Sequence, residues 1–202
     1  MKKRFLTYMK KNIQKQYPNY NNDKIDEIMY GIEGLYLTLT KAVIIFTAAY
    51  FLGIFKELLL LLITFNIIRL FSFGMHASNS YICLIFSSTL FIGGTFLCKY
   101  ITFNLNFLIL IYILCLISII LFAPADTIKR PLINKKKRMR FKILSIIVVL
   151  TYFIASLFIE NTLLVNCLAI GLIIESILIL PITYKLFKLP YNNYKKYDLN
   201  TK

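Results

Sequence analysis

Residues 104–124 read NLNFLILIYILCLISIILFAP, and no charged side chain interrupts them. A helix of roughly 20 apolar residues crosses the ~30 Å hydrocarbon core of a bilayer, so this stretch predicts a membrane-spanning helix. Five further apolar segments predict five more spans: 35–55, 58–74, 79–98, 143–159 and 162–182. Because the hydrocarbon holds no water to satisfy the backbone, each span must be helical. The sequence therefore predicts an all-α integral membrane protein with about six transmembrane helices.

The composition of the whole chain agrees with this class. Of its 202 residues 58% are apolar, yet 24 Lys and Arg stand against 9 Asp and Glu, a net charge of +15. Soluble nucleic-acid-binding proteins can be this basic, but they lack repeated apolar runs of this length, so no nucleic-acid partner is expected. The 17 Phe and 14 Tyr exclude a disordered chain, and four Cys without framework spacing argue against a secreted disulfide scaffold.

The positions of the basic residues predict the orientation in the membrane. Of the 24 Lys and Arg, 20 fall in the N-terminal region, the connector before residue 143 or the C-terminal tail. Cytoplasmic segments carry such an excess, so both termini are predicted to be cytoplasmic, as an even number of spans requires. The predicted parts are amphipathic cytoplasmic or interfacial helices over 1–33, a six-helix transmembrane domain over 34–184 with a basic cytoplasmic loop at 125–142, and a basic cytoplasmic tail over 185–202.

The N-terminal region has the pattern of a basic amphipathic helix. Phe5, Met9 and Ile13 recur at helical spacing among lysines, which favours a helix lying on anionic lipid. A solvated charged face without membrane contact is the alternative. Pro18 and the Asn-rich stretch after it predict a break, and Asn22 or Asp23 is a candidate cap for a second helix.

The only histidine of the chain, His76, lies seven residues before Cys83. Such a pair is the minimum apparatus for nucleophilic acyl transfer: the imidazole takes the thiol proton and the thiolate attacks a carbonyl. On one straight helix these residues would be separated by about 10 Å of rise, so His76 must lie on a loop that folds back over the next span. Gly74 supplies backbone freedom for that loop. A cap at Ser80 would put Cys83 in the first turn, where the helix dipole favours a thiolate.

An unrelated loop histidine near a core cysteine is the alternative reading of this pair. Asn79 is a candidate orienter of His76. One histidine, scattered cysteines and no acidic cluster do not make a usual zinc site, so neither a metal nor a cofactor is predicted. The other three cysteines are predicted to be inert packing residues: Cys98, Cys115 and Cys167.

Arg69 and Glu175 stand out among the charged residues inside predicted spans. Arg69 lies five residues before Gly74, and Glu175 lies six residues before Pro181, in spans that both run inward. Equal depth predicts that the two pair across the bundle. Arg69 binding a substrate carboxylate is the alternative.

These residues resemble the accessory gene regulator B (AgrB) family of Gram-positive quorum-sensing systems, over nearly the whole chain. Arg69, Gly74, His76 and Cys83 are similar to its Arg…Gly-Gly-x-His-x6-Cys motif. Phe73 departs from the motif, which commonly has a glycine there, so that backbone freedom before His76 rests on Gly74 alone. Three further segments resemble the family's cytoplasmic loop and last span: 123–127 with 129–132, the basic run Lys135, Lys136, Lys137 and Arg138, and 171–175 with 180–182.

The resemblance implies a multi-pass cell-membrane cysteine endopeptidase with its active site near the cytoplasmic face. Cys83 would be the nucleophile and His76 the general base and acid, with Arg69, Gly74 and Glu175 in support. The implied substrate is an AgrD-type propeptide, whose acidic tail is released before the rest closes into a thiolactone or lactone ring. The run from Lys135 to Arg138 would attract that tail.

Other functions and partners stay open on the sequence alone. The chain could be a small transporter or channel subunit with Arg69, His76 and Glu175 lining a path, or a scaffold that holds the propeptide without cleaving it. Membrane lipids are predicted partners, and a homodimer is a further candidate assembly.

Overall fold

The computed structural model describes residues 2–75, 80–127 and 132–195. In these residues the chain forms eight helices: α1 (Lys2–Gln16), α2 (Asn22–Phe51), α3 (Phe55–Ser72), α4 (Ser80–Tyr100), α5 (Leu105–Phe122), α6 (Lys135–Phe158), α7 (Thr162–Ile179) and α8 (Pro181–Leu186). A β-bridge joins Phe73 to Ala125. The prediction of an all-α chain is therefore confirmed.

The chain divides into two compact units, Met1–Ala48 and Ala49–Lys202. In the first unit α1 packs on the first half of α2, since the rings of Phe5 and Tyr36 stack with centroids 5.2 Å apart. Lys10 Nζ lies 2.6 Å from Asp26 Oδ1 between the same helices. The predicted second amphipathic helix and the predicted first span form one continuous helix, α2, because no proline interrupts residues 22–51.

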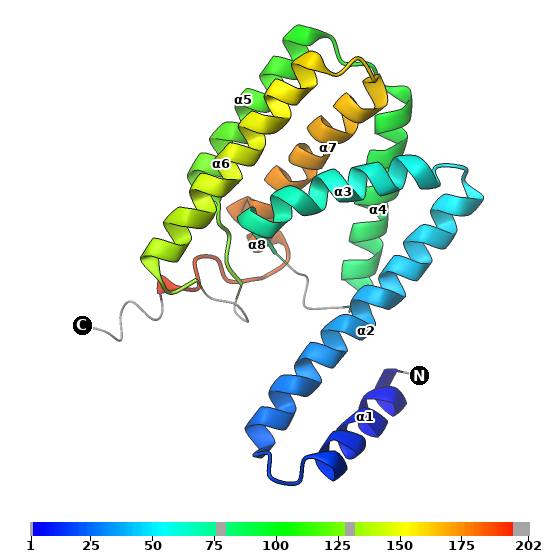
Figure 1. Ribbon diagram of the computed structural model, residues 1–202, viewed down its shortest axis with the longest axis vertical. Coiled ribbons are helices and arrows are strands. Elements are labelled where there is room, and N and C mark those ends of the chain that lie inside the picture. Colours follow the sequence, from blue (N-terminus) through cyan, green and yellow to red (C-terminus); the bar gives the residue numbers. More distant parts are fainter. Residues whose placement is uncertain (1, 76–79, 128–131, 196–202) are drawn as a thin grey trace. The chain divides into compact units, whose positions relative to one another are not determined.

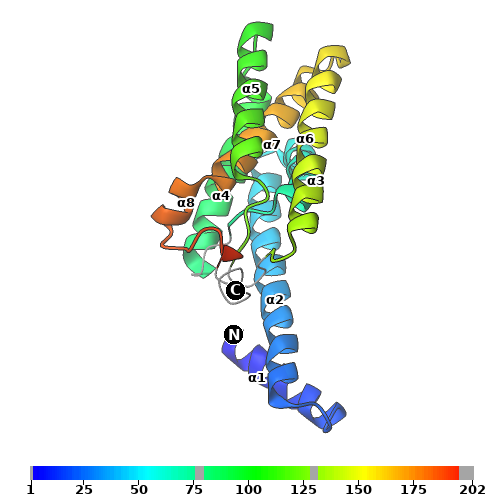
Figure 2. The same cartoon turned by 90° about the vertical axis from the view of Figure 1, so that its left-hand side faces the viewer.

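In the second unit α7 is the central helix. It contacts α3, α4, α5, α6 and α8, and Figure 1 shows α3 crossing it while α5 and α6 run side by side. Figure 2 shows α8 following the end of α7. Of the 18 residues of α7, 67% are buried, against 28% or less in the other candidate spans. A helix that is largely apolar can be buried on most sides, and α7 is such a helix.

Five helices are long and apolar enough to cross a membrane by length and composition: Lys24–Phe51, Ile82–Tyr100, Leu105–Phe122, Lys135–Phe158 and Thr162–Ile179. They correspond to five of the six predicted spans. The remaining one, 58–74, forms α3, whose 18 residues include Lys56, Glu57 and Arg69 and which is not among the five. Six spans and the orientation of the termini therefore stay predictions.

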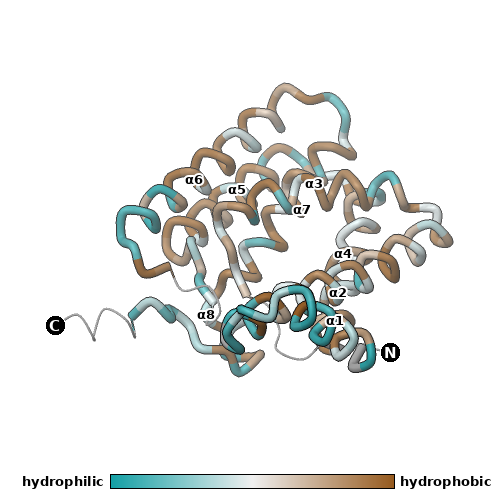
Figure 3. Tube along the Cα trace, turned by 60° about the horizontal axis from the view of Figure 1, so that its bottom comes forward, coloured by the Kyte–Doolittle hydropathy of each residue, from teal (hydrophilic) through white to brown (hydrophobic). Residues whose placement is uncertain are grey.

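Asparagine side chains begin three helices of this unit. Asn104, Asn134 and Asn161 accept from Phe107 N, Lys137 N and Leu164 N at 2.8, 3.2 and 3.2 Å. Such caps satisfy backbone donors that have no partner inside the helix. Because α6 begins after Asn134, the basic segment predicted as a loop to residue 142 is helical from Lys135 onward. Figure 3 shows α6 changing from hydrophilic at this end to hydrophobic along its length.

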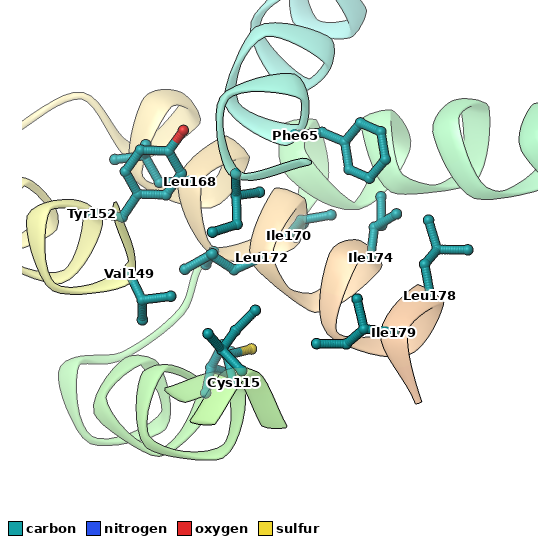
Figure 4. Packing of buried hydrophobic residues seen from close by; sticks show 14 of the residues in the cluster. Phe65, Cys115, Val149, Tyr152, Leu168, Ile170, Leu172, Ile174, Leu178 and Ile179 are labelled. Atoms are coloured by element: carbon teal, nitrogen blue, oxygen red, sulfur yellow. The ribbon is translucent and has the colours of Figure 1, made fainter. Parts of the chain in front are cut away.

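The core lies where α7 meets its neighbours. Figure 4 shows Phe65 of α3, Cys115 of α5 and Val149 and Tyr152 of α6 around α7. Gly171 allows α3 to approach closely, because a Cβ there would lie 2.9 Å from Thr64 Oγ1 and 3.2 Å from Phe65 N. The Tyr152 hydroxyl donates to Thr64 O at 2.8 Å. Small residues and buried hydrogen bonds of this kind hold membrane helices together.

Candidate active site

The segment that follows α3 reverses direction at two residues with positive φ. Phe73 has φ 62° and ψ −111°, and Gly74 has φ 100°. Only glycine adopts such values without strain. A side chain at position 74 would also clash with its surroundings, since a Cβ there would lie 2.6 Å from Arg69 Nη1. The predicted need for a glycine at this position thus has two physical causes.

Arg69 and Glu175 form an ion pair between α3 and α7. Arg69 Nη1 lies 3.0 Å from Glu175 Oε2, and the Glu175 side chain is fully buried. The hydroxyl of Ser72 donates to the other carboxylate oxygen. The predicted pairing of Arg69 with Glu175 is therefore confirmed.

The same guanidinium also holds the backbone of the chain reversal. Arg69 Nη2 donates to Met75 O at 2.8 Å, while Met75 N donates to Leu178 O at 3.3 Å. Met75 is buried, and the next residue in the sequence is His76. The ion pair and the end of α7 thus fix the chain immediately before the predicted base.

The segment after α5 pairs with this reversal from another direction. Ala125 N donates to Ser72 O and Gly74 N donates to Ala125 O, both at 2.9 Å. The Tyr184 hydroxyl of α8 donates to Ala125 O at 3.3 Å and to Asp126 O at 3.1 Å. Burial raises the pKa of Tyr184, so its hydroxyl stays protonated and keeps donating.

Cys83 lies in the first turn of α4, as predicted, but Ser80 is the first residue of this helix and not its cap, and the residue before it lies outside the described residues. It is half-buried, whereas Cys98, Cys115 and Cys167 are buried. Those three belong to the core, as expected for packing residues. His76 and Asn79 lie outside the described residues.

The basic run does not form one uniform surface. Lys135, Lys136 and Lys137 are exposed in the first turn of α6. Arg138 is half-buried, and its guanidinium carbon lies 3.6 Å from the ring centroid of Tyr194. The exposed lysines are accessible to an anion in solution, while Arg138 contacts Tyr194 of the C-terminal segment. Among the described residues no group of three or more His, Cys, Asp or Glu could hold a metal ion.

Asp126 lies in the segment 123–127 that resembles the family's cytoplasmic loop, and the sequence alone predicts no role for it. The structure buries its side chain, which accepts from the backbone N–H groups of Asn193 and Tyr194 at 2.9 and 2.8 Å. One signal could have identified it: Asp126 is the only acidic residue in the basic segment 125–142.

Phe73 offers a direct test of the chain reversal. Residues with a Cβ pay about 1–3 kcal/mol in such conformations, so Phe73→Gly should unfold at a higher temperature than Phe73→Ala. Both variants lose the ring contact with Phe141, whose centroid lies 4.9 Å away, so only the backbone differs. Thermal unfolding in detergent measures the order of the two unfolding temperatures.

A matched control is the same pair of substitutions at the helical position Phe153. There the Gly variant should unfold at a lower temperature than the Ala variant, because glycine destabilises a helix relative to alanine. Equal behaviour at the two positions would contradict the strain at Phe73.

Comparison with known proteins identifies the family. The family model for accessory gene regulator B matches residues 3–179. Staphylococcus aureus accessory gene regulator protein B is 36% identical over 183 residues, covering 89% of this chain and 92% of the relative. AgrB-like proteins of Clostridium acetobutylicum and Listeria innocua are each 31% identical, over 87% and 85% of this chain and 84% of each relative. No solved structure matches. With these matches over most of its length, the chain belongs to the accessory gene regulator B family.

Proposed function

We propose that the protein is a membrane cysteine endopeptidase that removes the C-terminal tail of an AgrD-type propeptide, with Cys83 as nucleophile and His76 as general base and acid. One observation carries the proposal. Arg69, Gly74 and Glu175 are gathered at the segment that ends one residue before His76, and Cys83 stands in the first turn of the next helix. A chain that only crosses the membrane has no need of such a constrained reversal.

The wider setting agrees with this chemistry. The chain is a multi-pass membrane protein with five candidate spans, and membership of the accessory gene regulator B family supports a role in quorum sensing. The active site is proposed near the cytoplasmic face of the cell membrane. A position at the membrane boundary would help exclude water from an acyl intermediate.

The proposed reaction has two acyl transfers. His76 takes the proton of the Cys83 thiol, and the thiolate attacks the carbonyl before the tail. The imidazolium then protonates the leaving amine, so that the peptide bond breaks and a thioester to Cys83 remains. An internal Cys or Ser of the peptide attacks this thioester, closes a thiolactone or lactone ring and returns the Cys83 thiol. Backbone N–H groups in the first turn of α4 are the candidate oxyanion donors, because they lack partners inside the helix.

The exposed lysines at the start of α6 fit an acidic tail. Lys135, Lys136 and Lys137 share one helical turn, and their attraction for a carboxylate-rich peptide would weaken as salt screens it. We therefore propose that these three lysines attract the acidic tail of the substrate. Arg138 contributes less to this attraction, because its guanidinium stacks on the ring of Tyr194. The same lysines suit anionic lipid headgroups, and self-association into a homodimer stays a prediction.

Trapping the thioester tests the proposal. A synthetic AgrD-type propeptide whose internal nucleophile is replaced by alanine cannot cyclise, so acyl-enzyme should accumulate in reconstituted vesicles. After an acid quench, intact mass should increase by the mass of the peptide without its tail, less one water, and hydroxylamine should remove the addition. Peptide mapping should place it on Cys83. Tail release without any adduct, or an adduct on Cys98, Cys115 or Cys167, would refute the assignment, and peptide transport without tail release would favour the transporter.

A further inference from the structure

The C-terminal segment does not leave the bundle after α8. Phe187, Leu189 and Tyr191 pack against the core of the second unit, and Leu189 N donates to Tyr184 O at 2.8 Å. Figure 1 shows this segment, in red, returning from α8 toward the start of α6. We call residues 189–195 the C-terminal strap. The predicted cytoplasmic tail is thus folded against the second unit as far as Lys195.

A buried carboxylate fastens the strap. Asp126 is 3% exposed, and its two oxygens accept separately from Asn193 N at 2.9 Å and Tyr194 N at 2.8 Å. The Asn193 side chain donates to the same carboxylate at 3.5 Å. Hydrogen bonds to a charged group are stronger than neutral ones, and a buried carboxylate requires them. Asp126 therefore joins two parts of the chain that are 67 residues apart.

The strap is connected by hydrogen bonds to the reversal before His76. The backbone of Ala125 exchanges two hydrogen bonds with Ser72 and Gly74, and the Tyr184 hydroxyl bridges Ala125 O and Asp126 O. The residue that Asp126 binds through its backbone N–H, Tyr194, also stacks its ring on Arg138, which follows the exposed lysines in α6. One buried carboxylate thus connects the strap, and through it Arg138, to the segment that pairs with Ser72 and Gly74.

We propose that Asp126 is a positioning residue of the peptidase site: by fastening the C-terminal strap it holds residues 123–126 against the segment that carries His76. The inference rests on the proposed function. Releasing the strap would loosen Ala125 and Gly74, and a small misplacement of a reacting group lowers the rate of the chemical step. Because Asp126 is not required to touch substrate, the turnover number should change and the Michaelis constant should not.

Asp126→Asn tests this in the full-length protein reconstituted in vesicles, with a synthetic AgrD-type propeptide as substrate. An amide of the same shape turns one acceptor into a donor, so kcat of tail release should fall about tenfold or more, with KM within about twofold of wild type. Hydrogen exchange at the amides of Asn193, Tyr194 and Gly74 should accelerate. Asp26→Asn, the same change at a more exposed carboxylate in the other unit, should alter none of these quantities.

Tyr184→Phe provides a second variant that leaves the buried charge in place. It removes only the hydroxyl that bridges Ala125 O and Asp126 O, so it should fold and lower kcat in the same direction. Unchanged kcat in both variants, together with faster exchange in the strap, would overturn the inference. Cys83→Ala is assayed in parallel. If tail release requires Cys83 while both variants keep full kcat, the proposed function stands and only the role of Asp126 fails.

Discussion

Replacing Cys83 with alanine is expected to lower tail release by about 10³-fold or more while the protein still accumulates in the membrane. Alanine removes the proposed nucleophile but leaves the first turn of α4 and its half-buried surroundings intact. Cys83→Ser should be almost as inactive, because a hydroxyl is a far weaker nucleophile than a thiolate with the same base. His76→Ala should fall to a similar level, since removing either member of a nucleophile–base pair removes the function of both.

Cys115→Ala is the matched control for these variants. It removes a thiol of the same size from the buried core, so kcat should stay near that of wild type even where unfolding begins at a lower temperature. Quantifying the released tail by mass spectrometry, normalised to folded protein, separates the two effects. Tail release that persists in Cys83→Ala would end the nucleophile assignment. Peptide transport or peptide binding that is unchanged in Cys83→Ser, with no tail released even by the wild type, would instead favour a transporter or a scaffold, for which loss of a thiol changes little.

The sequence was most informative where one physical requirement dominates. Bilayer thickness fixes how many apolar residues a span needs, so five predicted segments correspond to helices apolar enough to cross a membrane. The cost of a charge in hydrocarbon made Arg69 and Glu175 conspicuous, and the prediction that they lie at similar depth led to a pairing that the structure shows. The segment 58–74 was harder, because charged residues near both ends of α3 weaken its hydrophobic signal.

Contacts made by irregular backbone could not be read from the pattern. The strap is short and has no helical or strand periodicity, so nothing in residues 189–195 points to Asp126. The bond depends on two backbone N–H groups, which every residue except proline carries. The left-handed Phe73 was equally hidden, because phenylalanine is a poor indicator of positive φ. Its place beside Gly74 in a motif that commonly holds two glycines was the one available hint.

Breaking the ion pair of Arg69 and Glu175 is expected to have the second largest effect. Glu175 is fully buried, so Arg69→Met leaves a carboxylate without its counter-charge, and losses of about 3–5 kcal/mol follow such changes. That is a large part of the stability of a small protein, and little folded Arg69→Met protein should accumulate. Arg69→Met with Glu175→Leu removes both charges and should recover accumulation, because replacing a buried pair with apolar groups is often neutral.

In that double variant the amount of folded protein should recover while kcat of tail release should not. Its helices can pack, but Met75 O has lost the guanidinium donor at 2.8 Å, so kcat should stay about 10- to 100-fold below wild type. Arg69→Lys separates the ion pair with Glu175 from the hydrogen bond to Met75 O. The lysine ammonium keeps the positive charge opposite Glu175 but cannot also donate to Met75 O as the two guanidinium nitrogens do. This variant should accumulate normally, with a lower kcat and a KM near that of wild type. A raised KM with unchanged kcat would mean that Arg69 binds a substrate carboxylate instead, since uniform loss of binding affects KM alone. Which of these two constants changes in Arg69→Lys therefore decides whether the buried pair holds the chain before His76 or recognises the peptide.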